Sequence, residues 1–180
     1  MMRLELFKVF EGAVKPETCD ELNDRFQQMR EGMVGLEESV LNRTDRISNV
    51  GALSNNEPIA EYLFNLCTLT NGILSWDLDI TGLEDLQLTE YGKDGHYGWH
   101  TDCDPFLKLG GLHRKVTAVL MLSDDFAYSG GDLEIEGLEL PRLKKGDVIV
   151  FPSVVKHRVK PVESGLRRTL VCWTTGPYFK

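Results

Sequence analysis

The spacing of apolar and polar positions changes from helical to extended near residue 73. Before that point, apolar residues recur three and four positions apart in two stretches, and each stretch begins at a proline, a residue favoured in the first turn of a helix. These stretches predict helices over residues 16 to about 30 and 58 to about 70. A strand is expected over 4–10, and the Gly- and Asn-rich region 31–56 is expected to be mainly loop with a short strand.

After residue 73, short segments of alternating pattern are separated by clusters of Gly, Pro, Asp and Ser. The predicted strands are 76–80, 84–91, 116–122, 133–140, 147–151, 156–161 and 168–175. Many short strands with regular turn signals are typical of a sandwich or a jelly roll. We therefore predict one α+β domain over residues 1–180 with a mainly β core. Its helical part covers about 1–72 and its jelly-roll core about 73–180.

The composition narrows the classes of protein that fit this pattern. With 180 residues, 42 % of them hydrophobic, the chain can bury one substantial core. Its formal net charge of −8 argues against a nucleic-acid partner, because such proteins usually present a basic surface. No apolar run reaches the roughly 18 residues of a membrane span, and the N-terminal run is too short for a signal peptide.

The cysteines indicate whether the protein works in a reducing or an oxidising compartment. The chain has four, and none forms a Cys-x-x-Cys pair, which favours free thiols in a reducing environment over a disulfide framework or a zinc site. A cytoplasmic protein without a membrane partner is therefore expected. The sequence gives no indication of oligomeric state.

The most informative chemistry is a His-x-Asp pair, His100 and Asp102, with a second histidine, His157, far downstream. Residues i and i+2 of a strand point to the same face, so the first two side chains would meet at one spot. Two imidazoles and one carboxylate form a ligand set that holds non-haem Fe(II) on one face and leaves the opposite positions open. His96 and His113 are much weaker candidates, and His96 is expected in a loop or on an outer rim.

Further motifs extend this pattern in a fixed order. They are the segment Tyr91 to Asp102, the run Tyr-Ser-Gly-Gly-Asp-Leu at 128–133, the run Gly-Asp-Val-Ile-Val-Phe-Pro-Ser at 146–153, and His157 followed ten residues later by Arg167. Over about residues 87–173, the set resembles the 2-oxoglutarate/Fe(II)-dependent dioxygenases, specifically the prolyl 4-hydroxylase-like branch. The resemblance implies a double-stranded β-helix, or jelly roll, with flanking N-terminal helices.

The resemblance also implies a set of cofactors. His100, Asp102 and His157 would bind Fe(II) and act in catalysis, 2-oxoglutarate and O₂ would be co-substrates, and ascorbate is a candidate reductant. The resident metal itself is not fixed by the sequence, because Ni, Mn or Zn can occupy such a site.

The same resemblance assigns Arg167 to the distal carboxylate of 2-oxoglutarate, for which a planar guanidinium is a bidentate partner. Arg168 is the rival, because adjacent strand residues face opposite ways and only one of the two can point inward. Thr169 would share the inward face of Arg167 and is a candidate for the same carboxylate. Tyr91 is a candidate contact of the oxo acid, or equally an ordinary aromatic residue of the barrel. Many family members use a tyrosine on the strand after the metal pair, but the corresponding residue here is Met121.

The substrate is the least defined part of the prediction. Two regions, 32–56 and 104–114, are candidate walls of the substrate entrance. The second has an apolar tip and a Gly pair, which suit a loop that closes over substrate. Trp173 falls on the alternating face of Arg167 and is either a wall of the iron pocket or a core aromatic residue.

The resemblance implies oxidative decarboxylation of 2-oxoglutarate coupled to hydroxylation of a C–H bond, with a prolyl residue of a peptide or protein as the substrate. A free amino acid or another small molecule is the alternative. Nucleic-acid demethylases of the AlkB type share the metal triad, but the acidic charge disfavours them. A non-enzymatic, cupin-like metal-binding module is the contrasting class, and an inward-facing Arg167 discriminates against it.

Overall fold

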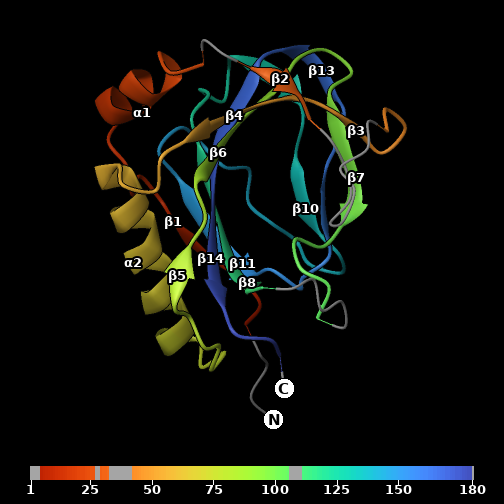
Figure 1. The fold of residues 1–180 in the computed structure, drawn as a ribbon. Helices are drawn as coiled ribbons and strands as arrows, with labels where there is room; N and C mark the ends of the chain where they lie inside the picture. The colour runs from red at the N-terminus through yellow and green to blue at the C-terminus, as the bar shows by residue number, and fades with distance from the viewer. Residues whose placement is uncertain (1–4, 27–28, 33–41, 106–110, 180) are drawn as a thin grey trace.

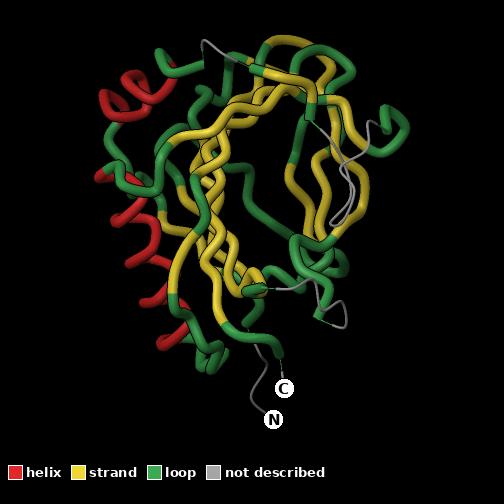
Figure 2. The backbone as a smooth tube through the Cα atoms, in the orientation of Figure 1, coloured by secondary structure: helices red, strands yellow, loops and turns green. Residues whose placement is uncertain are grey.

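A computed structural model describes residues 5–26, 29–32, 42–105 and 111–179 of the chain. Two β-sheets face each other, and two helices lie along the outer side of the larger sheet (Figure 1). Figure 2 shows the same layers by secondary structure, with the helices on one side only. The space between the sheets is therefore bounded by strands on both sides.

The larger sheet has the order β1-β11-β8-β14-β6-β4-β2, with β5 paired to β14, and every pair is antiparallel. Its strands are β1 (Lys8–Phe10), β2 (Arg30–Glu31), β4 (Asn49–Leu53), β5 (Gly82–Leu83), β6 (Leu86–Tyr91), β8 (His113–Met121), β11 (Val148–Pro152) and β14 (Arg167–Gly176). The long strands β8 and β14 lie side by side in its centre. Strands distant in sequence are thus neighbours throughout, as a jelly roll requires.

The smaller sheet has the order β10-β12-β7-β3 and is also antiparallel. Its strands are β3 (Arg46–Ile47), β7 (His96–His100), β10 (Leu133–Ile135) and β12 (His157–Val159). A separate pair, β9 (Tyr128–Gly130) and β13 (Val162–Gly165), completes the β structure of the described residues.

The helices are α1 (Pro16–Asn23) and α2 (Pro58–Ile73), and each has its proline in the first turn, as predicted. Helix α2 packs on β8, β11 and β14. Its fully buried Leu63 joins Val116, Leu120 and Leu170 of the sheet in the main apolar core. Neither helix in the described residues combines the length and the apolar character that crossing a membrane requires.

The predicted fold class, a mainly β jelly roll with flanking N-terminal helices, is confirmed. The strand predicted over 133–140 is too long, because β10 ends at Ile135 and a turn follows. Two further predicted elements are wrong. The first helix ends at Asn23 rather than near residue 30, because Arg30 is extended and pairs with Val50. The strand predicted over 76–80 is not formed, because Ser75 and Asp77 adopt positive φ angles of 51° and 54°, which interrupt an extended backbone.

The first 72 residues contribute more to the sheets than their sequence indicates. Strands β1 and β4 lie in this part and pair with β11 and β6 of the larger sheet. Strand β3 joins the smaller sheet through β7. The boundary drawn near residue 72 therefore coincides with the end of α2 and does not separate helix from strand.

Packing of α2 predicts a clear difference between two leucines of the same helix. Leu63 is fully buried, whereas Leu69 is 51 % exposed. Leu63→Ala should lower the free energy of unfolding by about 2–5 kcal/mol, because it leaves a cavity in the core. Leu69→Ala should change it by less than about 1 kcal/mol. Urea denaturation at 25 °C measures both, and equal effects would contradict the packing described here.

Candidate functional site

Strand pairing brings the two histidines of the triad together. In the antiparallel ladder of β7 and β12, His157 lies directly opposite His100. Their ring centroids are 4.2 Å apart, and His157 also packs edge-on against Phe151 at 4.8 Å. Residues that are 57 positions apart in sequence therefore present their imidazoles to the same point between the sheets.

Asp102 is fixed immediately after the end of β7 by bonds to the larger sheet. Its backbone N–H donates to the Ser153 carbonyl at 2.9 Å, and the Thr117 hydroxyl donates to its Oδ2 at 2.7 Å. Burial alone would raise the pKa of this carboxyl group. The neighbouring His157 and His100 rings and the Thr117 hydrogen bond outweigh burial and hold the pKa below its usual value. Asp102 is therefore a buried carboxylate at neutral pH.

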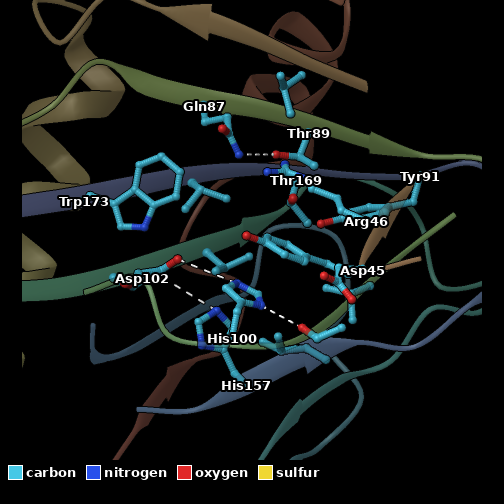
Figure 3. A pocket seen from close by; sticks show the side chains of 18 of the residues that line it. Asp45, Arg46, Gln87, Thr89, Tyr91, His100, Asp102, His157, Thr169 and Trp173 are labelled. Carbon is cyan, nitrogen blue, oxygen red and sulfur yellow. Dashed lines mark hydrogen bonds and ion pairs between the residues drawn. The ribbon is translucent and has the colours of Figure 1, made fainter. Parts of the chain in front are cut away.

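Both imidazoles direct the same nitrogen toward this carboxylate. The Nδ1 atoms of His100 and His157 donate to the carbonyl oxygens of Gly98 and Val155, at 2.8 and 2.9 Å, because a carbonyl can only accept. The Nε2 atoms therefore carry free lone pairs in the neutral rings. They lie 3.7 and 3.6 Å from the Asp102 carboxylate oxygens (Figure 3).

The donor set fits a divalent metal. All three ligand atoms lie within 4.8 Å of one another, and the two imidazole–carboxylate separations are longer than hydrogen bonds. Burial and the adjacent His157 lower the pKa of His100 to about 4, which keeps its imidazole neutral and able to bind a metal at pH 7. Backbone carbonyls that fix the ring tautomer are the usual outer partners of metal-binding histidines. Two imidazoles and one carboxylate suit Fe(II) with open positions.

The triad opens into a cavity of about 540 Å³ whose other wall is cationic. Arg167, at the start of β14, lines this cavity although it is only 1 % exposed. Its Nε has no hydrogen-bond partner within the described part of the chain. No carboxylate in that part forms an ion pair with it. A buried guanidinium in this condition favours an anionic ligand.

The rival arginine faces away from the cavity. The Arg168 guanidinium donates from Nε to Glu90 at 2.8 Å and lies over the Phe26 ring at 4.8 Å. The alternation of side chains along β14 thus separates the two arginines as expected. The structure places Arg167 rather than Arg168 on the cavity wall.

The other two predicted binding residues also line the cavity. Thr169 is buried on β14, directly opposite Thr89 of β6 and Met121 of β8. Tyr91 is buried on β6 opposite Arg167, whose guanidinium carbon is 5.4 Å from the Tyr91 ring centre. Burial raises the pKa of Tyr91, although nearby arginines partly oppose it, so its phenol stays protonated. Both side chains therefore offer neutral hydroxyl groups.

The alternating pattern of the sequence did not predict one aromatic contact of the metal site, that of Tyr97. Tyr97 stacks on His100 with ring centroids 3.5 Å apart and planes at 11°, and Arg46 lies 4.5 Å from the Tyr97 ring centre. Alternation places Tyr97 and His100 on opposite faces because they are three residues apart. The register shifts between His157 and Val159, which pair with His100 and Tyr97 respectively. This bulge puts both rings on one face, and no residue type in the segment signals it.

Trp173 lines the cavity and is 8 % exposed. The Arg114 guanidinium stacks on its ring at 3.7 Å and is itself held by Glu84 through two hydrogen bonds of 2.7 Å. The indole Nε1 has no partner among the described residues. Of the two interpretations of Trp173, the cavity wall is therefore the one that the structure supports.

The remaining histidines lie away from the triad. The His96 ring nitrogens lie 2.9 and 3.1 Å from the carbonyl oxygens of Asp94 and Thr44. His113 packs against Tyr178 at the far end of β8. Residues 33–41 and 106–110, which include parts of both predicted entrance regions, are outside the described residues. Asp45 and Arg46 from the first of these regions do line the cavity, and so do Arg30 and Glu31 just before it.

Comparison with known families agrees with this geometry. The model of the 2OG-Fe(II) oxygenase superfamily matches residues 86–175, which is half of the chain and contains the triad and Arg167. The chain belongs to the 2OG-Fe(II) oxygenase superfamily. The resemblance found in the sequence to the 2-oxoglutarate/Fe(II)-dependent dioxygenases is thus confirmed at the level of the superfamily.

Relatives of this 2OG-Fe(II) oxygenase include PKHD-type hydroxylases. A protein of Synechococcus sp. strain CC9902 is 41 % identical over 80 residues, covering 43 % of this chain and 35 % of that protein. One of Teredinibacter turnerae is 38 % identical over 88 residues, covering 46 % and 39 %. The matched segment thus spans well under half the length of these relatives.

Solved structures share the whole fold. The viral collagen prolyl hydroxylase of Paramecium Bursaria Chlorella virus-1, in complex with 2OG, has a TM-score of 0.72 at 18 % identity, covering 96 % of this chain and 97 % of that one. The Pseudomonas putida prolyl-4-hydroxylase has a TM-score of 0.70 at 20 % identity, with coverage of 94 % and 92 %. At identities of 18 % and 20 %, these similarities show a shared fold and nothing about the reaction.

The geometry of the triad predicts which histidine controls metal affinity. His157→Ala should weaken Fe(II) binding by at least about 10-fold, because it removes one of three ligand atoms. His96→Ala should leave the affinity within about twofold, because that ring contacts backbone carbonyls outside the cluster. Anaerobic equilibrium dialysis with Fe(II) measures both constants. Equal losses in the two variants would contradict the assignment.

Proposed function

We propose that the protein is an Fe(II)- and 2-oxoglutarate-dependent dioxygenase that hydroxylates a C–H bond, with a prolyl residue of a peptide or protein as its substrate. The observation that carries the proposal is the buried Arg167, which forms no ion pair with a carboxylate of the described residues and lines the same cavity as the His100, Asp102 and His157 triad. A metal-binding module needs the triad alone, whereas a dicarboxylic oxo acid needs both ends of this cavity.

His100, Asp102 and His157 would hold the Fe(II). Fe(II) supplies activation of O₂ coupled to oxidative decarboxylation of the oxo acid, with ascorbate as a candidate reductant. The lowered pKa of His100 keeps its imidazole neutral and the lowered pKa of Asp102 keeps its carboxylate ionised, so the site offers a carboxylate charge and an imidazole lone pair to a divalent ion. The Thr117 hydroxyl and the Ser153 carbonyl keep the carboxylate oriented. These three protein ligands leave coordination positions open toward the cavity.

Arg167 would bind the distal carboxylate of 2-oxoglutarate, and Thr169 and Tyr91 would add neutral hydroxyl groups. The planar guanidinium fork matches a carboxylate bidentately. Its burial makes the pairing strong, since little water competes. The cavity, at about 540 Å³, has a size typical of small-molecule sites.

The wall between these two ends would exclude water and orient the substrate. Tyr97 and Trp173 contribute aromatic surface next to the triad, and charged residues of β2 and β3 line the same cavity. The proposal of a peptide substrate is supported by a neighbour in fold. A Trichoplax adhaerens prolyl hydroxylase, solved with a hypoxia inducible factor peptide fragment, has a TM-score of 0.66 at 16 % identity, covering 94 % of this chain and 83 % of that one. A free amino acid is the alternative substrate.

The cytoplasmic location that the cysteines indicate stays a prediction.

The reaction is tested by succinate formation from 2-oxoglutarate with Fe(II) in air. The native protein should form succinate slowly alone and faster with a proline-containing peptide that gains one oxygen atom, while free L-proline should not accelerate it. Asp102→Ala should reduce succinate by more than the roughly 10- to 100-fold typical of losing an outer-sphere partner. Full turnover in Asp102→Ala would rule out the metal assignment, and acceleration by free proline alone would favour the small-molecule alternative.

The two adjacent arginines provide a matched pair for the oxo-acid end. Arg167→Met should weaken anaerobic binding of 2-oxoglutarate to the Fe(II)-loaded protein by about 10- to 100-fold, because it removes a charge-assisted bidentate contact. Arg168→Met should leave that affinity within about twofold, since it disturbs the ion pair with Glu90 instead.

Thermal unfolding without ligand provides the control for these variants. Arg167→Met should be no less stable than the native protein, because it removes a buried, unpaired cation. Unchanged 2-oxoglutarate affinity in Arg167→Met would instead favour a non-enzymatic, cupin-like metal-binding module.

A further inference from the structure

We propose that Arg46 and Arg30 form a second anion site in the cavity, separate from the oxo-acid end, and that this site binds a carboxylate of the substrate. This inference rests on the proposed function and names the chemistry of its substrate, an acidic peptide. Its basis is a pair of guanidinium groups that line the cavity where the edge strands β2 and β3 of the two sheets meet.

The lining of the cavity differs in charge from the chain as a whole. The chain has a formal net charge of −8, whereas four arginines and three acids of the described residues line the cavity. Of these arginines, Arg114 is held by an ion pair of its own, and Arg167 lies at the oxo-acid end. Arg30 and Arg46 therefore carry the positive charge for which the oxo acid gives no reason.

Arg46 is a buried cation that the fold holds in one position on the cavity wall (Figure 3). It is 7 % exposed, and its Nε donates to the Ser48 hydroxyl at 2.7 Å. Its guanidinium lies over the Tyr97 ring, 4.5 Å from the ring centre. Gly32 borders it closely, since a Cβ there would lie 2.6 Å from the Arg46 Nε and 2.9 Å from its Cζ. A guanidinium fixed in this way presents a preorganised charge to the cavity, where little water weakens its attraction for a carboxylate.

Arg30 brings a second cation to the same edge. It pairs with Val50 in the ladder of β2 and β4, and both residues line the cavity. Gly32, two positions further on, donates its N–H to the Ser48 carbonyl at 2.7 Å, which joins the end of β2 to the residue that follows β3 (Figure 1). No acid of the described residues forms an ion pair with Arg30. The two arginines therefore reach the cavity from adjoining segments.

The acids at this edge have other partners. Glu31 accepts two hydrogen bonds from Arg43, at 2.7 and 3.1 Å. The Asp45 carboxylate accepts one from the Asn42 amide at 2.6 Å. Both acids are therefore engaged by side chains that do not line the cavity.

The second anion site is separate from the oxo-acid end. In the larger sheet β2 lies three strands from β14, which corresponds to roughly 14 Å between Arg30 and the strand of Arg167. These two arginines are too far apart to bind the same carboxylate. A peptide that places a C–H bond near the triad can therefore place a neighbouring carboxylate at Arg30 and Arg46. A cavity wall of one sign also raises the local concentration of a substrate of the opposite sign.

The experiment compares two capped peptides that differ in charge alone. One is Ac-Gly-Glu-Glu-Pro-Glu-Glu-Gly-NH2, and the other has glutamine in place of each glutamate. Binding to the protein loaded with Mn(II) and 2-oxoglutarate is measured by calorimetry. The native protein should bind the glutamate peptide at least about 10-fold more tightly, and Arg46→Met should reduce this ratio to within about twofold. Arg25→Met, which removes an equal charge from a surface ion pair with Glu57, should leave the ratio unchanged.

Equal affinities of the native protein for the two peptides, or no binding of either, would overturn the inference. A loss of 2-oxoglutarate affinity in Arg46→Met as large as the loss of glutamate-peptide affinity would also overturn it, because Arg46 would then belong to the oxo-acid end. Succinate formation from 2-oxoglutarate alone judges the proposed function separately, so the two failures are distinguishable.

Should Arg46→Met not fold, Arg30→Glu is the second test, because Arg30 is exposed and its replacement leaves the core intact. Reversing this charge should weaken binding of the glutamate peptide by at least about threefold relative to the glutamine peptide. An unchanged ratio in Arg30→Glu would count against the second anion site.

Discussion

The site depends on a single register of strand pairing, in which His157 of β12 lies opposite His100 of β7. A slip of one residue would turn one imidazole to the outer face of the sheet and remove a metal ligand. The register is supported from both sides, because β10 pairs with β12 and β3 pairs with β7. The bond from Asp102 to the Ser153 carbonyl then ties the end of β7 to the larger sheet. The triad is therefore also a point at which hydrogen bonds join the two sheets.

A second constraint comes from the buried charge of Arg167. Removing a cation from water without a carboxylate partner costs several kcal/mol. The chain places this residue on β14, which pairs with both β6 and β8 and is backed by α2. The buried charge thus lies on a strand that is held by pairing on both sides and by the packing of α2. A loop in the same position would move the guanidinium to solvent and lose its selectivity for an anion.

Short-range patterns predicted much of this site, and long-range pairing explains what they missed. His100 and Asp102 follow from the two-residue period of a strand, as does the choice of Arg167 over Arg168. Tyr97 was missed because a bulge changes the local period, and a bulge depends on the partner strand. The contribution of β4 to the larger sheet was likewise hidden, since its short alternating run lies within a Gly- and Asn-rich region and pairs with a strand more than 30 residues away.

Two buried donors on the cavity wall determine which kind of ligand the cavity favours. Among the described residues, Arg167 Nε and Trp173 Nε1 are buried without partners, and both side chains line the cavity of the triad. Unpaired buried donors are rare in native proteins and cost about 1–3 kcal/mol each. A ligand that accepts hydrogen bonds and carries negative charge removes this penalty on binding, so it binds the folded chain selectively and stabilises it by mass action. The same two buried donors thus make the cavity selective for a small acid.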